Sequence, residues 1–401
     1  MIPLLKRALP VLLGFFLVAN ATVMERGGAS IRATDLIALG MAALLVTRAG
    51  SGRFPWSALA VALSLAFLPL AWVGLTLLGL SGSATLAQGA RWLMAVPWAL
   101  VLLEMLGSEP ARTRFIKGLA IGCAFNVFVV LAQHFGFAGP LERLGFSSYG
   151  SRLVWVGKQL RLPGLHGGPG ASAAVISLVA PATLWLYLKD RASIVWPIVG
   201  YAAAGVALHL VATRSPQLMI ALTTMLALTV TLQRRRGMIL WALLLGVGLP
   251  LLVFVGPPGG QVRWTLGGDT AVNVSDRILS NQTALELTLA HPLGMGVDAS
   301  QRALFLETGL RSTHNAWLQV ATVFGIPVAL IIGIAMIFLI ARLRFGWKSD
   351  AFWPALVAFH LAGLFLFEEH LNNPTFVILT VWLVVTAVTT RGRRSDQSMR
   401  A

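Results

Sequence analysis

Long apolar runs separated by short polar or charged segments dominate this chain. Breaks such as Gly50-Ser51-Gly52 and Asn372-Asn373-Pro374 stop helices between the runs. A membrane-spanning helix needs roughly 20 mostly apolar residues. The pattern therefore predicts an all-α, polytopic membrane protein with about 12 transmembrane helices, placed near residues 8–24, 34–47, 56–80, 86–106, 118–136, 170–188, 193–213, 216–232, 237–255, 314–340, 352–367 and 376–390.

Two polar segments, 137–169 and 256–313, are too long to be simple turns between spans. Loops of this length are usually functional or contain structure of their own. The second segment begins with an irregular, Gly-rich stretch. Its pattern then predicts a helix over Ser275–Leu289, and Gly294-Met295-Gly296 follows that helix. The expected organisation is one integral membrane domain over 1–390, a large loop that contains short helices, and a basic tail over 391–401.

Composition supports the membrane assignment. Hydrophobic residues make up 57% of the 401 residues, charged residues 11%, and the mean hydropathy is +0.78. Ordinary soluble domains carry about 25% charged residues. The net charge of +16 does not indicate a nucleic-acid partner, because the basic residues fall between apolar runs. The one cysteine, Cys123, excludes an intramolecular disulfide.

The basic residues also predict an orientation. Connections on the side of the N-terminus hold 19 of the 31 basic residues but five of the 15 acidic ones. Positive charge favours the cytoplasmic side, so both termini are expected there, and the two long segments on the opposite side. Ala19-Asn20-Ala21 resembles a signal-peptidase site, but the first apolar run is interpreted as an uncleaved helix.

Two arginines stand out on the outer side. Arg214 lies in a connection of a few residues between two apolar runs, and Arg277 lies in the long outer segment beside Asp276. Each has an ordinary explanation: Arg214 as a snorkelling interfacial residue, Arg277 as a solvated or Asp-paired one. Each also suits anion binding, because a guanidinium stays charged and its planar fork matches phosphate.

His314 opens an apolar run and faces the same outer compartment in the predicted topology. A histidine at such a boundary is more often structural than catalytic. Its flanking polar residues, Thr313 and Asn315, and its ability to take a proton near neutral pH make it a candidate general base.

The first outer segment is basic and ends in a Gly/Pro-rich stretch that contains Arg161 and His166. It is either a solvated basic loop or a surface that contacts anionic lipid or glycan. The basic residues that precede the stretch are Arg143, Arg152 and Lys158.

A metal site is not expected. Glu368, Glu369 and His370 are capable ligands, but consecutive residues at a helix end cannot all face one ion. The chain has no Asp-x-Asp motif, and the sequence predicts no cofactor.

With these elements, the chain resembles bacterial O-antigen ligases, GT-C-like membrane glycosyltransferases in a superfamily with O-antigen polymerases and protein O-oligosaccharyltransferases. The most specific match is His314-Asn315, followed after nine residues by Gly325 at the start of a late helix. The family then has Gly, Thr or Tyr where this chain has Val328. That departure concerns a helix-packing position and not the chemistry.

Two more motifs follow the family's order. The Ser/Thr-Arg-Gly/Ser element is Thr213-Arg214-Ser215. The arginine that opens the loop helix is Arg277, and the Pro-Leu-Gly-x-Gly stretch is 292–296. The resemblance covers the whole chain in span count, loop placement and motif order, although each motif alone is weak.

The resemblance implies transfer of a glycan from undecaprenyl pyrophosphate to a lipid A–core sugar hydroxyl. The reaction would be inverting and metal-independent, on the periplasmic side of the bacterial inner membrane. Arg214 and Arg277 would stabilise the pyrophosphate, and His314 would take the acceptor proton. Further substrate contacts would come from Arg161, Asn315, His166, Arg143, Arg152 and Lys158. The implied partners are the two lipid-linked substrates and membrane lipids, with no nucleic acid.

Three alternatives remain open. An O-antigen polymerase uses the same donor but extends another lipid-linked glycan. A protein O-oligosaccharyltransferase shares the His-Asn region and is usually longer. A transporter is disfavoured, because mid-span charges are few and no two-fold repeat is visible.

Overall fold

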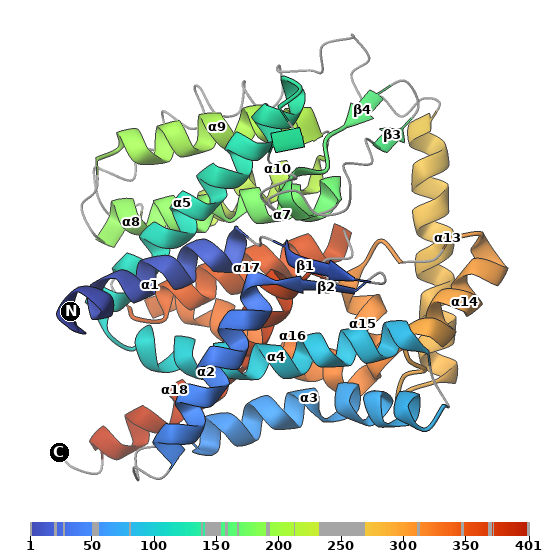
Figure 1. Cartoon of the computed structure of the whole chain (residues 1–401), viewed down its shortest axis with the longest axis horizontal. Helices are drawn as coiled ribbons and strands as arrows, with labels where there is room; N and C mark the ends of the chain where they lie inside the picture. The colour runs from blue at the N-terminus through green and yellow to red at the C-terminus, as the bar shows by residue number, and fades with distance from the viewer. Residues whose placement is uncertain are drawn as a thin grey trace. The chain divides into compact units, whose positions relative to one another are not determined.

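The computed structural model describes residues 2–19, 22–26, 29–49, 56–79, 82–137, 139–140, 154–156, 159–166, 168–189, 193–211, 213–231, 269–310, 313–345, 349–367, 371 and 373–398. Most of the described residues lie in helices (Figure 1). They form two compact units. The first comprises Met1–Leu36, Met105–Trp264 and Ile340–His360, and the second comprises Ile37–Glu104, Thr265–Leu339 and Leu361–Ala401.

The first unit is organised around a long central helix, α5 (Glu109–His134), against which α1 (Ile2–Val18) packs. Backbone of α1 approaches so closely that a Cβ on Gly118 would collide with the carbonyl of Val11, and one on Gly14 with that of Phe115. Small residues at contacts between membrane helices allow this approach. The other helices of this unit are α7 (Pro169–Ser177), α8 (Val179–Lys189), α9 (Val195–Val211), α10 (Ser215–Thr231) and the 3₁₀ turns η1 (Gly164–His166) and η3 (Ala341–Phe345).

The second unit contains α3 (Trp56–Leu77) and α4 (Ser83–Met105), with α13 to α16 and α18 (Pro374–Ser398). Most of α2 (Ala33–Ala49) and the end of α17 (Phe352–Phe367) also belong to it. Its aromatic core includes a T-shaped contact between Trp92 and Phe324, whose ring centroids are 5.6 Å apart. The helices of the outer segment and of the late span are α13 (Asp269–Ala290), α14 (Val297–Thr308), α15 (Ala316–Phe324) and α16 (Ile326–Ile340).

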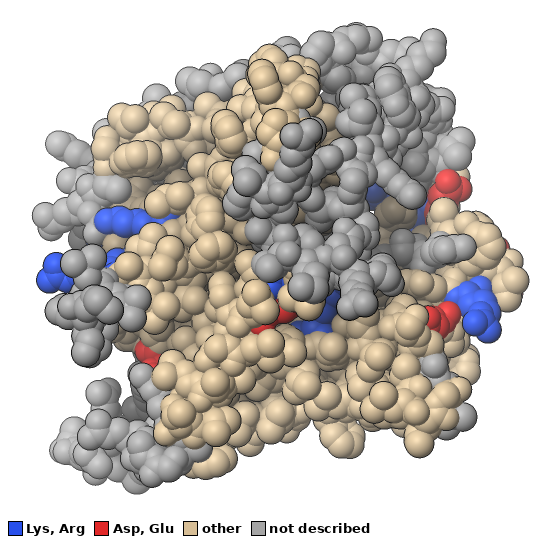
Figure 2. Space-filling view, viewed as in Figure 1, with Lys and Arg blue, Asp and Glu red and all other residues tan. Residues whose placement is uncertain are grey.

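The described helices confirm a multi-pass membrane protein in outline. Within the described ranges, five helices are long and apolar enough to cross a bilayer: Trp56–Leu77, Ser83–Met105, Glu109–His134, Pro169–Lys189 and Ile326–Phe345. Several shorter apolar helices accompany them. Large apolar side chains on these spans face outward, as Phe67 does on α3 and Ile334 on α16. The surface over α3 and α4 is correspondingly almost free of charge (Figure 2).

The structure differs from the all-α expectation near the N-terminus. The first helix ends at Val18, and the chain forms an antiparallel hairpin of β1 (Thr22–Arg26) and β2 (Ala29–Arg32). Residues up to 24 therefore do not extend the helix. Gly27-Gly28 separates the two strands in sequence and is a typical hairpin-turn signal. The apolar run before it favoured a longer first helix, so the hairpin was not predicted. A second hairpin pairs β3 (Val154–Val156) with β4 (Gln159–Arg161).

Three further differences concern the later helices. The predicted helix over 314–340 is broken at Gly325 into α15 and α16. The outer segment contains α14, which the sequence did not predict, and α18 continues to Ser398 into the predicted basic tail. The predicted span over 237–255 lies outside the described residues.

Candidate functional site

His314 stands immediately before α15 and is held in place by its two neighbours. The hydroxyl of Thr313 donates to the backbone carbonyl of Asn315 at 2.8 Å. The Asn315 side chain is the N-cap of α15, because its Oδ1 accepts from the backbone N–H groups of Trp317 at 2.9 Å and Leu318 at 3.2 Å. The Asn315 oxygen is therefore used in helix capping, and the pair of anchors fixes the backbone on both sides of His314.

Arg277 lies in α13, where its side chain is half-buried. Its Nη1 donates to the carbonyl oxygen of Phe367 at 3.2 Å. Phe367 is the last residue of α17, so this carbonyl belongs to the final turn of the helix, where carbonyls have no partner within the helix. The contact anchors the guanidinium of Arg277 in the same unit as His314.

The electrostatic environment keeps His314 neutral. Burial lowers the pKa of His314 below its usual value, the positive charge of Arg277 lowers it further, and the negative charge of Asp276 partly opposes both. Its imidazole is consequently a proton acceptor at neutral pH. Among the described residues, no hydrogen bond to the ring nitrogens of His314 is formed, so the ring has acceptor capacity for a substrate hydroxyl.

Backbone hydrogen bonds join the loop 292–296 to the junction of α15 and α16; we call this set of bonds the backbone latch. The N–H groups of Met295 and Gly296 donate to the carbonyls of Thr322 and Val323, both at 3.0 Å. The N–H of Ile326 donates to the carbonyl of Pro292 at 2.8 Å. The loop 292–296 thus donates hydrogen bonds to carbonyls at the end of α15, and its Pro292 carbonyl accepts the first N–H of α16.

Glycine is required at the centre of this latch. Gly325 has a φ of +97°, and a Cβ there would lie 2.7 Å from the backbone carbon of Leu293. Gly294 has a φ of +84°, and its Cβ would lie 2.5 Å from the carbonyl oxygen of Val323. The motifs that contain Gly294 and Gly325 therefore pack against each other. This contact fixes the direction of α15, the short helix that follows His314. Val328, where the sequence departs from the family pattern, is 2% exposed, in agreement with a packing position.

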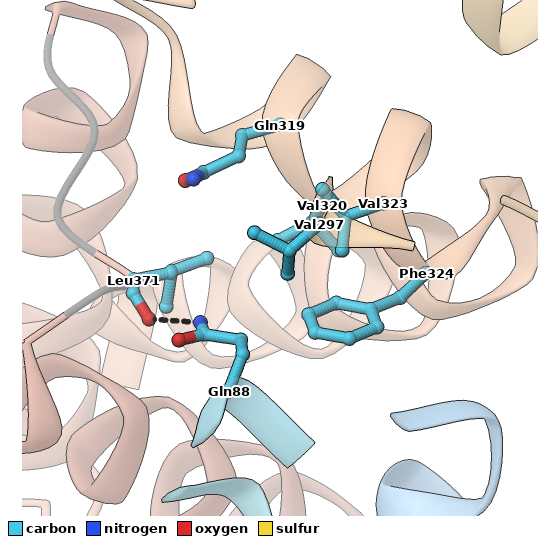
Figure 3. Close-up of a pocket in the computed structure, with 7 residues that line it drawn as sticks. All are labelled: Gln88, Val297, Gln319, Val320, Val323, Phe324 and Leu371. Carbon is cyan, nitrogen blue, oxygen red and sulfur yellow. Dashed lines mark hydrogen bonds between the residues drawn. The ribbon is translucent and has the colours of Figure 1, made fainter. Parts of the chain in front are cut away.

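A small cavity of about 10 Å³ lies beside α15 (Figure 3). Two amides line it, Gln319 from α15 and Gln88 from α4, and the Gln88 Nε2 donates to the carbonyl of Leu371 at 2.6 Å. Nη1 of Arg91 donates to Oε1 of Gln88 at 3.3 Å. The remaining lining is apolar: Val297, Val320, Val323 and Phe324, with the side chain of Leu371.

The sequence analysis did not identify Arg91 and Gln88. Both lie in an apolar helix long enough to span the bilayer. A lone arginine in such a span is a signal for function, because charge is costly there. Arg91 lies within the predicted helix over 86–106, so its position inside a span is the sequence signal for it.

Arg214 belongs to the first unit, whereas His314 and Arg277 belong to the second. It lies just before α10, and its carbonyl accepts the N–H of Leu218 at 3.0 Å, so it occupies the N-terminal boundary of that helix. Its side chain is half-buried, and the preceding Thr213 is buried.

The structure buries His166 in η1. Its Nε2 lies 2.9 Å from the carbonyl of Val18, and its backbone N–H donates to Oγ of Ser172 at 3.1 Å. Burial lowers the pKa of His166 to about 3, the charge of Arg32 lowers it as well, and the bond to Val18 acts in the opposite direction. The neutral ring thus ties the end of α1 to the loop before α7, and a substrate contact for His166 stays a prediction.

The other predicted contacts are placed in part or not at all. Arg161 ends strand β4, where its backbone pairs with Val154. Arg143, Arg152 and Lys158 lie outside the described residues, as do Glu368, Glu369 and His370. In the described part of the chain, no group of three His, Cys, Asp or Glu side chains lies close enough to hold a metal ion.

Part of the chain matches a known family model. Residues 199–333 match the family model described as O-antigen ligase. The matched segment covers most of α9, all of α10, and the region from α13 through the first half of α16. It includes Arg214, Arg277 and His314. A search of curated proteins found no match. Residues 199–333 are therefore similar to a domain found in O-antigen ligases.

Proposed function

We propose that this protein is an O-antigen ligase, which transfers a finished glycan from undecaprenyl pyrophosphate to a sugar hydroxyl of lipid A–core. The match of residues 199–333 to the O-antigen ligase family carries the proposal. The arrangement in the second unit adds to it, because the matched segment brings a neutral histidine under the influence of an anchored arginine. A base and an anion-binding group are the two parts that glycan transfer from a pyrophosphate requires.

In the proposed mechanism, the anomeric carbon of the donor is attacked once, by the acceptor hydroxyl. The imidazole of His314 accepts the hydroxyl proton as the new glycosidic bond forms. The bond to the pyrophosphate breaks with inversion, and negative charge grows on the leaving oxygens. Arg277 stabilises that charge through charge-assisted hydrogen bonds, and Arg214 is assigned the same role from its motif. The transfer needs no enzyme nucleophile, no metal and no cofactor.

The remaining assignments rest on sequence. Arg161 is proposed as a further phosphate contact, and the basic residues Arg143, Arg152 and Lys158 as contacts to the acidic acceptor lipid. The proposed topology has one membrane domain over 1–390, both termini in the cytoplasm, and the segments 137–169 and 256–313 in the periplasm. Charge asymmetry of the connections supports this orientation.

The test is glycan transfer by the purified full chain in detergent with EDTA present. The donor is undecaprenyl-pyrophosphate glycan and the acceptor is lipid A–core. Transfer to lipid A–core in EDTA is the expected result. Dependence of the rate on added divalent cation would contradict the metal-independent mechanism.

The same assay separates the alternatives by product. Elongation of the lipid-linked donor, with no product on lipid A–core, would identify a polymerase. Transfer to an added acceptor protein would identify a protein O-oligosaccharyltransferase. Movement of the donor across a vesicle membrane, without any new glycosidic bond, would identify a transporter.

A further inference from the structure

Helix α13 has an inverted distribution of side chains. Its buried face carries small or hydroxyl-bearing residues: Ser280, Thr283, Ala284 and Thr288. Its exposed surface carries large aliphatic residues, Ile278 (53% exposed), Leu279 (46%), Leu285 (49%) and Leu289 (68%). The polar residues Ser275, Gln282 and Glu286 are also exposed there. A helix on the surface of a water-soluble domain has the opposite pattern, with the aliphatic face inward.

The buried face of α13 is a close, hydrogen-bonded contact. Oγ1 of Thr288 lies 2.9 Å from Oγ1 of Thr322 on α15, and the Thr322 hydroxyl also lies 3.2 Å from the carbonyl of Ala284. Small and hydroxyl-bearing residues at helix contacts, with aliphatic residues outside, are typical of helices packed in lipid. The inverted pattern therefore indicates hydrocarbon beside the exposed face.

Contacts within the second unit place this region at the end of a membrane span. Oδ2 of Asp298, in the first turn of α14, accepts from both the backbone N–H and the hydroxyl of Thr85 at 2.9 Å. Thr85 lies in the first turn of α4, whose apolar span begins there. Figure 1 shows α13 running across the direction of α3 and α4 at this end. An interfacial helix has this placement.

Large apolar side chains are also exposed in other segments of the second unit. Leu293 is 64% exposed in the loop after it, and Leu306 is 77% exposed on α14. Leu77 and Leu78, at the end of α3 that precedes α4, are each 75% exposed. The exposed aliphatic residues of α13 are thus similar in type and exposure to the outward-facing residues of the spans.

We propose that α13 is an interfacial helix whose face of Ile278, Leu285 and Leu289 enters the hydrocarbon of the lipid bilayer, with the exposed Gln282 and Glu286 beside that face at the level of the polar headgroups. Arg277 precedes this face by one residue and is anchored to the end of α17. The insertion holds its guanidinium at the depth of lipid phosphates. A lipid-linked pyrophosphate then reaches Arg277 without leaving the membrane; this last step rests on the proposed function, whereas the membrane contact does not.

The chain offers a simple labelling test, because its one cysteine, Cys123, is fully buried. Leu285→Cys and Leu289→Cys would each carry a nitroxide spin label in phospholipid nanodiscs. Ile334→Cys on α16 provides the lipid-facing control, and Glu307→Cys on α14 the water-facing control. The unsubstituted protein measures any labelling of Cys123.

Collision of each label with oxygen and with a water-soluble nickel complex gives the result. Labels at 285 and 289 are expected to follow Ile334→Cys, with oxygen favoured over nickel. Access of nickel equal to that at Glu307→Cys would overturn the proposal, because the face would then be in water. Protection from both reagents would also overturn it, by showing that protein, such as a second copy of this chain, covers the face.

The labelling needs no enzymatic turnover, so its failure is distinct from failure of the proposed function. A double substitution, Leu285→Glu with Leu289→Glu, tests the consequence for a lipid-linked donor. We expect a raised KM for donor in nanodiscs, because charged side chains are disfavoured in hydrocarbon. The protein's own packing should be retained, because both side chains are exposed. An unchanged KM would overturn the step from membrane contact to substrate access.

Discussion

The loop before α15 and the loop before α7 each place a histidine next to the start of a helix, and the two histidines end in opposite situations. His166 is buried, and its Nε2 already contacts the carbonyl of Val18. His314 is half-buried, its neighbours carry the structural bonds, and no hydrogen bond to its ring is formed within the described residues. The two loops therefore differ in the atoms that hold them: the ring nitrogen at His166, and the flanking residues at His314.

The largest expected effect comes from removing the His314 ring. His314→Ala should lower the rate of glycan transfer by roughly 10²–10⁴-fold, the usual contribution of a general base. The melting temperature should stay unchanged, because the Thr313 and Asn315 contacts remain. His134→Ala, which removes an exposed histidine at the end of α5, is the matched control and should retain the wild-type rate. A wild-type rate of glycan transfer in His314→Ala would show that His314 is not the general base.

The next effect tests the support of the His314 loop. Gly325→Ala should destabilise the protein by about 3 kcal/mol, because both the positive φ and the contact with Leu293 exclude a Cβ. Gly74→Ala is the control in the same unit: the position is helical and nothing lies within 4 Å of the added Cβ. That control should stabilise by about 0.5–1 kcal/mol. Equal melting temperatures for the two variants in detergent would show that the latch does not need glycine.

A smaller effect is expected at the other histidine. His166→Ala removes the contact with Val18 and leaves a cavity, so stability should fall by about 1–3 kcal/mol. The KM for donor should remain at the wild-type value in the folded fraction, measured after size-exclusion chromatography. A raised KM without any loss of stability would instead assign His166 to substrate binding, as the sequence suggested.

These loops also show how far sequence reasoning reaches. Apolar runs locate spans well, because a spanning helix must be long and apolar, and α3, α4, α9 and α17 lie close to their predicted ranges. The break at Gly325 was missed because a glycine within an apolar run looks like a packing glycine. Only the backbone of Leu293, 32 residues earlier in the chain, shows why the helix must stop.

The candidate site residues came from sequence motifs, and their catalytic roles stay predictions. His314 and Arg277 share an electrostatic environment, and the sequence had placed them in one compartment. The capping role of Asn315 and the burial of His166 were not predictable, because both depend on where neighbouring backbone groups point. Arg91 belongs to none of the predicted motifs, and its contact with Gln88 depends on the packing of α4.

The smallest effect is a shift in pH dependence, and it tests the charges around His314 in both directions. A base must be neutral, so transfer should fall as pH drops through the pKa of His314, which burial and Arg277 hold below its usual value. Asp276→Asn removes the negative charge that opposes them; the pKa should fall further and the acidic limb should move to lower pH. Arg277→Gln removes the positive charge; the pKa should rise and the limb should move to higher pH, on top of a lower rate.

The measurement is the rate of transfer between about pH 4.5 and 8 at fixed ionic strength, a range that spans the ordinary histidine value. Opposite shifts in the two variants would assign the limb to His314. Shifts in the same direction, or none, would mean that another group controls the limb, since the two substitutions change the local charge with opposite sign.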